Sequence, residues 1–433
     1  MKSKIILLSL VVSILCLGCK NVPTFEKDGG VRIVLKLSYS DFLKAAIVEG
    51  NDEQLQQVLT EIKEDQVKDF DEFINSYRKV EEKNFPEIRF ATIFMKLEWS
   101  EKINFNSTNE DVVKVLKQEW EKLFLSTNNI IIKRLANIEG AGIASVETDN
   151  GNHFIVKVPG IKDTKRIESI LSTIGELGFW ETYNNTEIFT YLNQINGYLV
   201  KKNYKSNAPD NSIKEELKNG SLETSSSLIS LLEKQNKKEA DSLVSMYPLF
   251  SLLTPLTSGD GQLISGSVIG SVQIKDTAEL SRLFLLDSVS YFLPLHCRLV
   301  FSKPIQQQDQ TYCEVIALKG NRANGPMIDG SVITSASVLP NENRNEIFMQ
   351  MSSEGTRTWR RMTSDNIGRQ IAITLDGIVY VHPVVQSQIE GGKSNITGNF
   401  TLDEATDLAF VLNSGKYPLK LNVLKTEVVE VRK

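Results

Sequence analysis

The main apolar stretch of the chain, Ile5–Leu17, is only thirteen residues long, and this limits what the chain can fold into. A helix needs about 20 apolar residues to cross the hydrocarbon core of a membrane. The next best segment, Val244–Leu256, is interrupted by Pro248 and Pro255. The sequence therefore predicts no membrane span after residue 18. With 433 residues, 41% of them hydrophobic, it predicts two or three domains with packed cores.

The first nineteen residues have the pattern of a lipoprotein signal peptide. Lys2 and Lys4 precede the apolar stretch, and Gly18-Cys19 closes it, although Cys16 stands where such signals usually have leucine. We expect removal of residues 1–18 and lipidation of Cys19, which would attach the protein to a membrane of the bacterial cell envelope, facing the periplasm. An ordinary secretory signal with an incidental cysteine is the alternative. The sequence does not distinguish the inner from the outer membrane.

The composition argues against several classes of function. A net charge of -5 and a pI of about 5.6 disfavour nucleic-acid binding, which needs a basic face. The three histidines, His153, His296 and His382, are far apart in the sequence, and we expect packing or surface roles for them. No paired catalytic motif is present. We therefore predict no catalytic residues, cofactor or metal ligands.

Two short motifs are better explained by structure than by ligand binding. Gly391–Ser394 resembles the end of a phosphate-binding loop, but Ser387 stands where that motif needs glycine, so a tight turn is favoured. Arg357, Arg360 and Arg361 could together hold a carboxylate or phosphate, although a solvated helix face is the favoured interpretation.

Cys297 and Cys313 flank a segment that we interpret as two strands around the polar loop Gln306–Gln310. In an antiparallel pair, the even sum of the two positions places both side chains on one face. A cross-strand disulfide and two separate thiols are both compatible with this pattern in an oxidising compartment. No neighbouring cysteine or histidine cluster indicates a metal site.

Local patterns in the second half predict several regular elements. Residues 370–382 form two alternating stretches joined by Asp376-Gly377, which suits a two-residue hairpin turn. An amphipathic helix is expected over 353–366, and Thr401–Glu404 has the pattern of a capping box at a helix start. Residues 419–431 alternate as a strand.

The first half mixes strands and helices. Residues 30–37 predict a strand, residues 40–83 two or three surface helices, and residues 110–125 a helix with Trp120 in the core. A strand over 153–159, a helix capped by Asp163 and a strand over 177–183 then predict a βαβ-like or split α+β unit. Residues 184–245 lose strand character and are expected to be a solvated helical insertion or a linker.

Segments distributed along nearly the whole mature chain resemble one known family. They are Gly29-Gly30, Lys102–Asn109, Val158–Gly160, Phe179–Tyr183, Pro248–Pro255, Ser267–Gly270, Val332–Ser335, Asn366–Ala372, Leu375–Tyr380, Gly391–Phe400 and Leu412–Pro418. In this order they resemble the first large extracytoplasmic domain of SecD, and of the fused SecDF, a subunit of the bacterial Sec protein-export machinery.

The resemblance implies an α+β fold in two subdomains. The base subdomain would be ferredoxin-like, with a split βαβ arrangement, and the head subdomain would be mixed α+β with helical insertions. We expect a signal peptide in 1–18, the base with a helical insertion in 19–183, a polar helical insertion or linker in 184–245, the head in 246–415, and a strand returning to the base in 416–433.

The chain also departs from the family. A lipid signal stands where the family has its first membrane helix. Arg134 is kept, but Ile132 and Ala136 replace polar family residues beside it. The family continues into five more membrane helices, one with a proton-carrying carboxylate, whereas this sequence stops at Lys433. The resemblance thus implies a module without a proton-driven motor of its own.

The leading functional hypothesis is a non-catalytic, lipid-anchored module that binds translocating polypeptide or Sec partners. The partners implied by the resemblance are exported preproteins and Sec translocon components, besides the membrane reached through the lipid anchor. The alternative is a repurposed envelope lipoprotein that binds an unrelated ligand. A hydrolase using carboxylates has no motif to support it.

Overall fold

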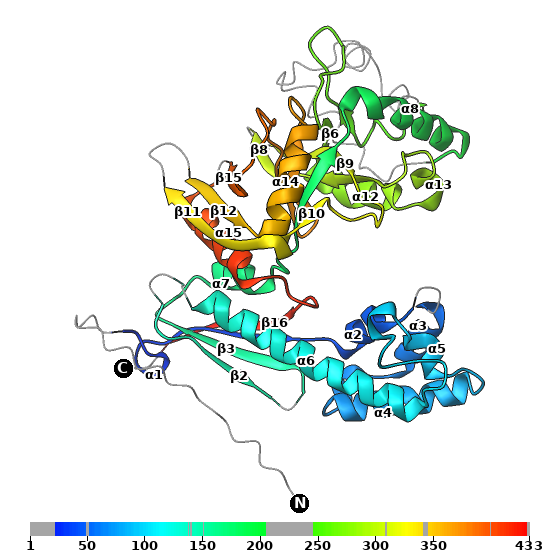
Figure 1. Cartoon of the computed structure of the whole chain (residues 1–433), viewed down its shortest axis with the longest axis vertical. Coiled ribbons are helices and arrows are strands. Elements are labelled where there is room, and N and C mark those ends of the chain that lie inside the picture. Colours follow the sequence, from blue (N-terminus) through cyan, green and yellow to red (C-terminus); the bar gives the residue numbers. More distant parts are fainter. Residues whose placement is uncertain are drawn as a thin grey trace, which may run out of the picture.

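The computed structural model describes residues 22–48, 52–136, 138, 141–149, 151–204, 246–307, 310–340, 345–398 and 400–430. These residues form two lobes, one above the other in Figure 1. We call the lower lobe the base (residues 22–174 and 416–430) and the upper lobe the head (residues 175–415). The expected signal peptide and Cys19 lie outside the described residues.

The base is built on a four-stranded antiparallel sheet in the order β16-β1-β3-β2. Its strands are β1 (Gly30–Lys36), β2 (Ser145–Thr148), β3 (His153–Pro159) and β16 (Asn422–Val429). Helices α6 (Asn109–Leu135) and α7 (Thr164–Ser172) share a core with the buried residues of β1, which alternate as Val31, Ile33 and Leu35. The chain order β1-α6-β2-β3-α7-β16 is that of a ferredoxin-like unit.

A glycine pair opens β1 because no side chain fits there. A Cβ atom on Gly29 would lie 2.1 Å from the carbonyl oxygen of Val429, and one on Gly30 would lie 2.1 Å from that of Val158. Gly29 also has a φ of +65°, which residues with a side chain rarely adopt. The pair lets β1 lie between β16 and β3 from its first residue.

A helical insertion between β1 and α6 extends the base to one side (Figure 1). Its helices are α2 (Tyr39–Ala46), α3 (Asp52–Glu61), η1 (Glu64–Gln66), α4 (Phe70–Asn84), α5 (Phe90–Phe94) and η2 (Leu97–Trp99), and a short α1 (Phe25–Asp28) precedes β1. The predicted helices in 40–83 and the core position of Trp120 are confirmed. Trp120 stacks on Phe70 at 5.1 Å and meets Tyr39 edge-on at 4.7 Å between ring centroids.

The base ends before the expected boundary at residue 183. Residues 177–182 do form a strand, β4 (Leu177–Thr182), but it pairs with β13 (Ile371–Leu375) and β9 (Gln310–Lys319) in the head. Five of its six residues are buried, which suits a central strand covered on both faces. The base sheet is completed instead by β16, so the head is inserted between α7 and β16.

The head contains a nine-stranded sheet whose main path is β14-β13-β4-β9-β6-β5. Its other members are β5 (Thr254–Pro255), β6 (Val268–Gln273), β7 (Cys297–Phe301), β8 (Ile305–Gln307), β10 (Ile328–Asp329) and β14 (Ile378–Val381). The helices and 3-10 turns beside it are α8 (Asn185–Lys201), η3 (Ile274–Asp276), α12 (Thr277–Phe284), α13 (Asp287–Ser290) and η4 (Gly330–Val332).

The prediction of a helical insertion in residues 184–245 is confirmed for its first part, but the expected solvated character is wrong there. Residues 185–201 form α8, which begins with a capping box at Asn184. Ile188, Leu192 and Ile195 of this helix have no exposed surface and belong to the core beneath β6 and β9. The rest of that expectation, residues 205–245, lies outside the described residues.

A three-stranded antiparallel sheet completes the head, in the order β11-β12-β15. Its strands are β11 (Ile333–Pro340), β12 (Asn345–Met351) and β15 (Lys393–Thr397), accompanied by α14 (Ser353–Asp365) and α15 (Leu402–Ser414). The predicted hairpin is confirmed, with φ of +52° at Asp376 and +80° at Gly377. The capping box of Thr401 and Glu404 at α15 is confirmed too.

Candidate functional site

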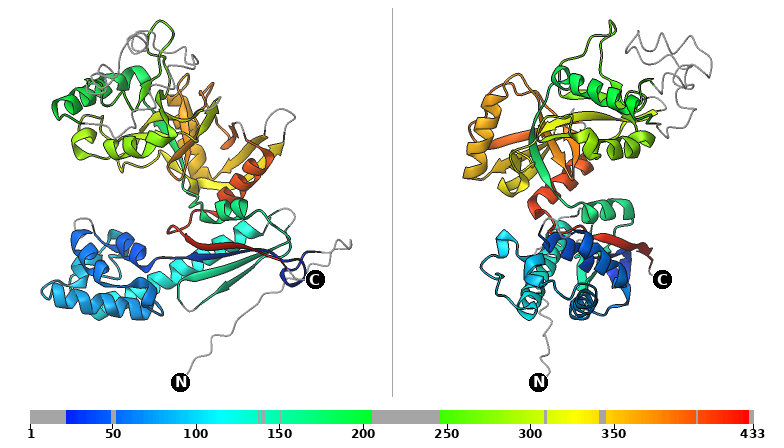
Figure 2. Two further views of the ribbon diagram at one scale, coloured as in Figure 1. Left: turned by 180° about the vertical axis from the view of Figure 1, so that it is seen from behind. Right: turned by 90° about the vertical axis from the view of Figure 1, so that its right-hand side faces the viewer.

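The two lobes meet at a narrow waist where α7 of the base lies beside α15 of the head (Figure 2). The chain crosses this waist twice, near residues 173–176 and 414–417. Arg134, in the last turn of α6, reaches both crossings and has no exposed surface. Its guanidinium donates to four main-chain carbonyl oxygens, those of Ile170, Thr173, Ile174 and Gly415.

The remaining contacts of Arg134 are with side chains of the return crossing. Its Nε donates to Ser414 Oγ at 3.0 Å, and the guanidinium lies 4.0 Å from the centroid of the Tyr417 ring. No carboxylate hydrogen-bonds to it in the described part of the chain. Burial lowers the pKa of Arg134 from its ordinary value, because the charged form is removed from water. A cation is thus held by carbonyl oxygens at the point where the lobes join.

Asp376 holds the N–H groups of the same crossing from the head side. Its carboxylate accepts from the backbone N–H groups of Ile174 at 2.8 Å, Gly175 at 2.9 Å and Glu176 at 2.8 Å. The hairpin turn at Asp376-Gly377 places this carboxylate over the crossing. The peptide segment is therefore bound through its carbonyls by the base and through its N–H groups by the head.

Ion pairs and a cleft lie beside the waist. Arg166 of α7 binds Asp407 of α15 in a bidentate pair with a shortest distance of 2.9 Å between Nη2 and Oδ1. A cleft of about 570 Å³ opens next to the crossings, between residues 172–174 and 420–423, with Asp376 at its wall. The waist is therefore built from specific polar contacts and has open space beside it.

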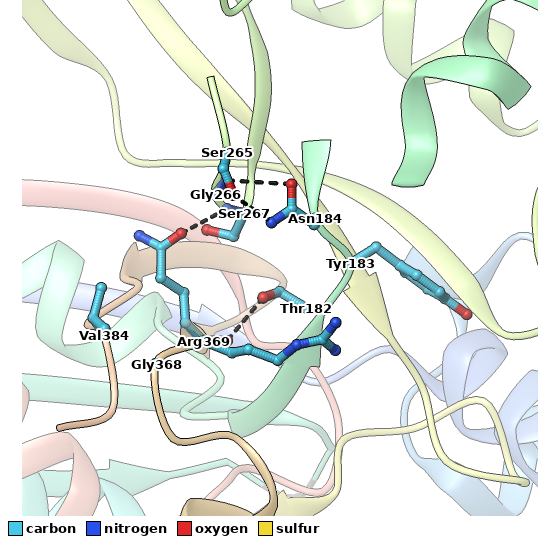
Figure 3. Close-up of a pocket in the computed structure, with 10 residues that line it drawn as sticks. Thr182, Tyr183, Asn184, Ser265, Gly266, Ser267, Gly368, Arg369 and Val384 are labelled. Carbon is cyan, nitrogen blue, oxygen red and sulfur yellow. Dashed lines mark hydrogen bonds between the residues drawn. The ribbon is translucent and has the colours of Figure 1, made fainter. Parts of the chain in front are cut away.

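The head contains a smaller cavity of about 180 Å³ where three segments meet (Figure 3). The segments are Thr182–Asn184, Ser265–Ser267 and Gly368–Gln370, with Val384 at the rim. Gln370 Oε1 accepts the backbone N–H of Ser267 at 2.6 Å. Polar groups and apolar surface line this cavity in nearly equal parts.

His382 connects this cavity to β9, which the sequence analysis missed by treating it as a packing or surface histidine. Its Nδ1 lies 3.1 Å from Nε2 of Gln370, and its Nε2 lies 3.0 Å from Oε2 of Glu314. His382 is 68 positions from Glu314 and 12 positions from Gln370 in the sequence, so no local motif reveals this group.

The two edges of the three-stranded sheet differ. On β11, the side-chain amide of Asn413 accepts the N–H of Ala336 at 2.8 Å and donates to its carbonyl at 2.7 Å, as a neighbouring strand would. On β15, the main chain bonds to β12 on one side and has no partner on the other side within the described residues. An extended polypeptide could therefore pair with β15 but not with the middle of β11.

The cysteines do not support the disulfide alternative. Both are free, and the β7–β9 register places Cys297 opposite Lys319. Cys313 is six residues further along β9, about 20 Å away by strand rise, whereas a disulfide joins Cα atoms within about 7 Å. The even sum of the two cysteine positions predicts only that both side chains lie on one face of the sheet, and not which residues of the two strands lie opposite each other. Burial raises the pKa of both thiols, that of Cys297 to about 12, so neither is a reactive thiolate.

Of the other singled-out residues, those of Gly391–Ser394 lead into β15, and the rest are separate from these sites. Arg357, Arg360 and Arg361 are exposed on α14. The Gly391–Ser394 segment is a turn into β15, with φ of +62° at Gly392. Asp163 caps α7 as predicted. Within the described ranges, no group of three or more potential ligand side chains could hold a metal ion, and no helix is long and apolar enough to cross a membrane.

Comparison with known proteins connects this geometry to a family. A family model described as the SecDF P1 head subdomain matches residues 308–419. The protein translocase subunit SecD of Rhodothermus marinus is 28% identical over 407 residues, which cover 93% of this chain and 62% of that protein. The chain is similar to SecD along most of its length, and residues 308–419 match the head-subdomain model. The family resemblance expected from the sequence is thereby confirmed.

Further SecD relatives match shorter regions. SecD of Syntrophobacter fumaroxidans is 37% identical over 105 residues, covering 24% of this chain and 20% of that protein. A crystal structure of SecDF in a super-membrane-facing form covers 95% of this chain and 32% of that chain, with 15% identity and a TM-score of 0.38. The chain thus spans less than two thirds of the length of the SecD relatives it matches.

A substitution at the waist tests the role of the Asp376 carboxylate in this SecD relative. We expect Asp376→Asn to keep the hairpin, because asparagine also adopts positive φ, but to lose acceptors for the N–H groups of residues 174–176. The free energy of unfolding in urea should fall by about 1–2 kcal/mol. Asp365→Asn, on the exposed face of α14, is the control. Equal stabilities for both variants would contradict the assigned role.

Proposed function

We propose that this chain is a SecD-like extracytoplasmic module that binds translocating polypeptide or a Sec partner. It acts as a non-catalytic accessory to protein export. The observation that carries the proposal is the match to a SecD subunit along 93% of the chain, together with the P1 head subdomain. The alternative is an envelope lipoprotein with an unrelated ligand.

The geometry of the head supports binding of an extended chain at β15. Main-chain hydrogen bonds at a strand edge do not depend on side-chain identity, so they suit a binding partner of variable sequence. Lys393, Asn395 and Thr397 alternate as exposed residues along this edge. Asn413 occupies the outward N–H and carbonyl of Ala336 in the middle of β11, so an incoming strand pairs more readily with β15 on the opposite side of the sheet.

Site-specific photo-crosslinking tests this proposal. A photo-reactive residue at Thr397 should capture an exported protein arrested during translocation, or a Sec subunit, in membranes. The matched control is Ser337, an exposed position on the blocked strand β11, from which we expect several-fold less capture. Equal capture from both positions, or none from Thr397, would contradict the binding mode. Capture of an envelope component instead would favour the alternative function.

Attachment to the membrane by lipid at Cys19 is a second part of the proposal. The charged, apolar and Gly-Cys pattern of residues 2–19 supports it. With a labelled fatty acid, the wild type should carry label and sediment with membranes. Cys19→Ser should lose the label and be released after secretion, because the acyl chains on Cys19 of the wild type are the stable attachment to the membrane. Label retained by Cys19→Ser would contradict lipidation at this residue.

A further inference from the structure

A chain of four polar residues runs from β9 to the wall of the head cavity. Glu314 Oε2 lies 3.0 Å from His382 Nε2, His382 Nδ1 lies 3.1 Å from Gln370 Nε2, and Gln370 Oε1 lies 2.6 Å from the backbone nitrogen of Ser267. Figure 3 shows the last of these contacts at the cavity. We propose that His382 is a proton-sensitive switch that sets the position of the cavity segment Ser265–Ser267 through Gln370.

The orientation of Gln370 determines the state of the ring. Its carbonyl oxygen accepts the N–H of Ser267, so its NH₂ group faces His382. An NH₂ group can only donate, and Nδ1 of the ring must therefore be the unprotonated acceptor. The single ring proton is then on Nε2 and is donated to Glu314. His382 is neutral in this arrangement.

Protonation of the ring makes this arrangement unfavourable. A charged imidazole has an N–H on both nitrogens, so Nδ1–H would point at the NH₂ group of Gln370. The Gln370 amide has to turn over and present its carbonyl oxygen to the ring, which removes that oxygen from the N–H of Ser267. The Oγ atom of Ser267 is buried and has no partner within the described chain, and it is an acceptor for the turned NH₂ group.

The surrounding charges allow the ring to take up a proton. Glu314 on β9 faces the ring, with 3.0 Å between its Oε2 and Nε2 of His382, and forms an ion pair with the ring when the ring is charged. The charged side chains of adjoining segments bind elsewhere: Arg369 pairs with Glu187 at 2.9 Å, Lys303 with Glu404 at 3.3 Å, and Lys319 with Glu181 at 3.1 Å. Protonation therefore changes the charge of the Glu314–His382 pair, and each of these three cations near it already has a carboxylate partner among the described residues.

The consequence concerns the head cavity directly. Ser265, Gly266 and Ser267 form one wall of it, and the Ser267 N–H is the point at which Gln370 holds that wall. A pH change across the titration of His382 moves this wall, so the shape of the head becomes pH-dependent. This regulates the head that we propose binds polypeptide, and in that sense it rests on the proposed function.

NMR of the protein labelled at histidine and in the backbone tests the switch without any binding partner. At pH 8 the ring of His382 should be the Nε2–H tautomer. As the pH is lowered until the ring takes up a proton, the backbone signals of Gly266 and Ser267 should move with the same midpoint as the ring. An Nδ1–H tautomer, or Ser267 signals that do not follow the ring, would overturn the proposal.

Variants separate the coupling from general effects on folding. In Gln370→Leu, the ring signals of His382 should still change with pH, but the backbone signals of Ser267 should no longer follow them. In Ser267→Ala, the midpoint of the change in the ring signals should be at a lower pH, because the turned amide of Gln370 loses an acceptor. His296→Asn is the control, since asparagine tolerates its φ of +61°, and it should change neither response. An unchanged response of Ser267 in Gln370→Leu would also overturn the proposal. A failure here leaves the crosslinking result at Thr397 unaffected.

Discussion

Replacing Arg134 with alanine is expected to lower the free energy of unfolding by about 3–5 kcal/mol, the range seen when a buried charged network is broken. The guanidinium donates to four carbonyl oxygens and to Ser414, and it has no exposed surface. Removing it leaves the carbonyls of Ile170 and Thr173 without a donor in the described residues, and each orphaned acceptor costs free energy. The carbonyls of Ile174 and Gly415 lose one donor each but keep the N–H of Tyr417 and the hydroxyl of Ser414. It also removes the cation stacked on Tyr417.

Urea denaturation would measure this loss, and limited proteolysis would show where it acts. Cleavage near residues 173–176 should become faster in Arg134→Ala, because Arg134 is the base's hold on that crossing. The free energy of unfolding of Arg134→Lys should lie between those of the wild type and Arg134→Ala, since one ammonium group cannot reach all of these acceptors. Lys133→Ala, at the exposed neighbouring position, should change stability by less than about 0.5 kcal/mol. A similar loss of stability in Lys133→Ala would show that the waist contacts of Arg134 are not the cause of the effect in Arg134→Ala.

The contrast between Arg134 and the hairpin at 370–382 shows what a sequence can predict. The hairpin depends on neighbouring residues: alternation sets the strands, and Asp376-Gly377 accepts the positive φ of the turn. Helix caps such as Thr401 with Glu404 are local in the same way. Arg134 instead binds residues up to 281 positions away, and nothing near it in sequence indicates those partners.

The pairing partners of a strand are equally difficult to predict from the neighbouring sequence. The pattern of residues 177–182 predicts a strand but not its neighbours, and those neighbours, β9 and β13, lie far along the chain. In the base sheet, the position expected for residues 177–182 is taken by β16, which pairs with β1. Arg32 and Glu427 lie opposite each other in this pair and are 395 positions apart in the sequence. Both faces of β4 are buried in the head, whereas β16 has no buried residue, and strand propensity does not encode either outcome.

The candidate sites follow the same rule. The sequence analysis reached the family, and thereby the export hypothesis, from many weak segments in one order. It could not reach the Glu314–His382–Gln370 chain or the amide of Asn413 on β11, because each combines residues from separate elements. A histidine or asparagine alone is ordinary, and only its geometry gives it a role.

The second large effect is expected at Glu81 in the helical insertion of the base. Glu81 of α4 has no exposed surface, and its Oε2 has no hydrogen-bond partner in the described residues, while Oε1 accepts only from Gln54 at 3.3 Å. Burial raises the pKa of Glu81 to about 7, with a further contribution from the charge of Glu82. The ordinary value of 4.5 applies to the unfolded chain.

The sign of the pH dependence follows from these two values. Between about pH 4.5 and 7 the native state binds more protons at Glu81 than the unfolded state does, so the stability of the protein falls as pH rises through this window. Glu81→Gln keeps the shape without the charge. It should raise the free energy of unfolding by about 2–3 kcal/mol at pH 8 and leave it nearly unchanged at pH 4.

Urea denaturation of wild type and Glu81→Gln at a series of pH values would measure this difference directly. Glu121→Gln, at an exposed position of α6, is the matched control and should change stability little at any pH. A Glu81→Gln effect that is the same at pH 4 and pH 8 would mean that the loss of the charge is not its cause. A destabilised variant at pH 8 would mean that the ionised carboxylate has a stabilising partner, because only a favourable contact could offset removal of a charge from water.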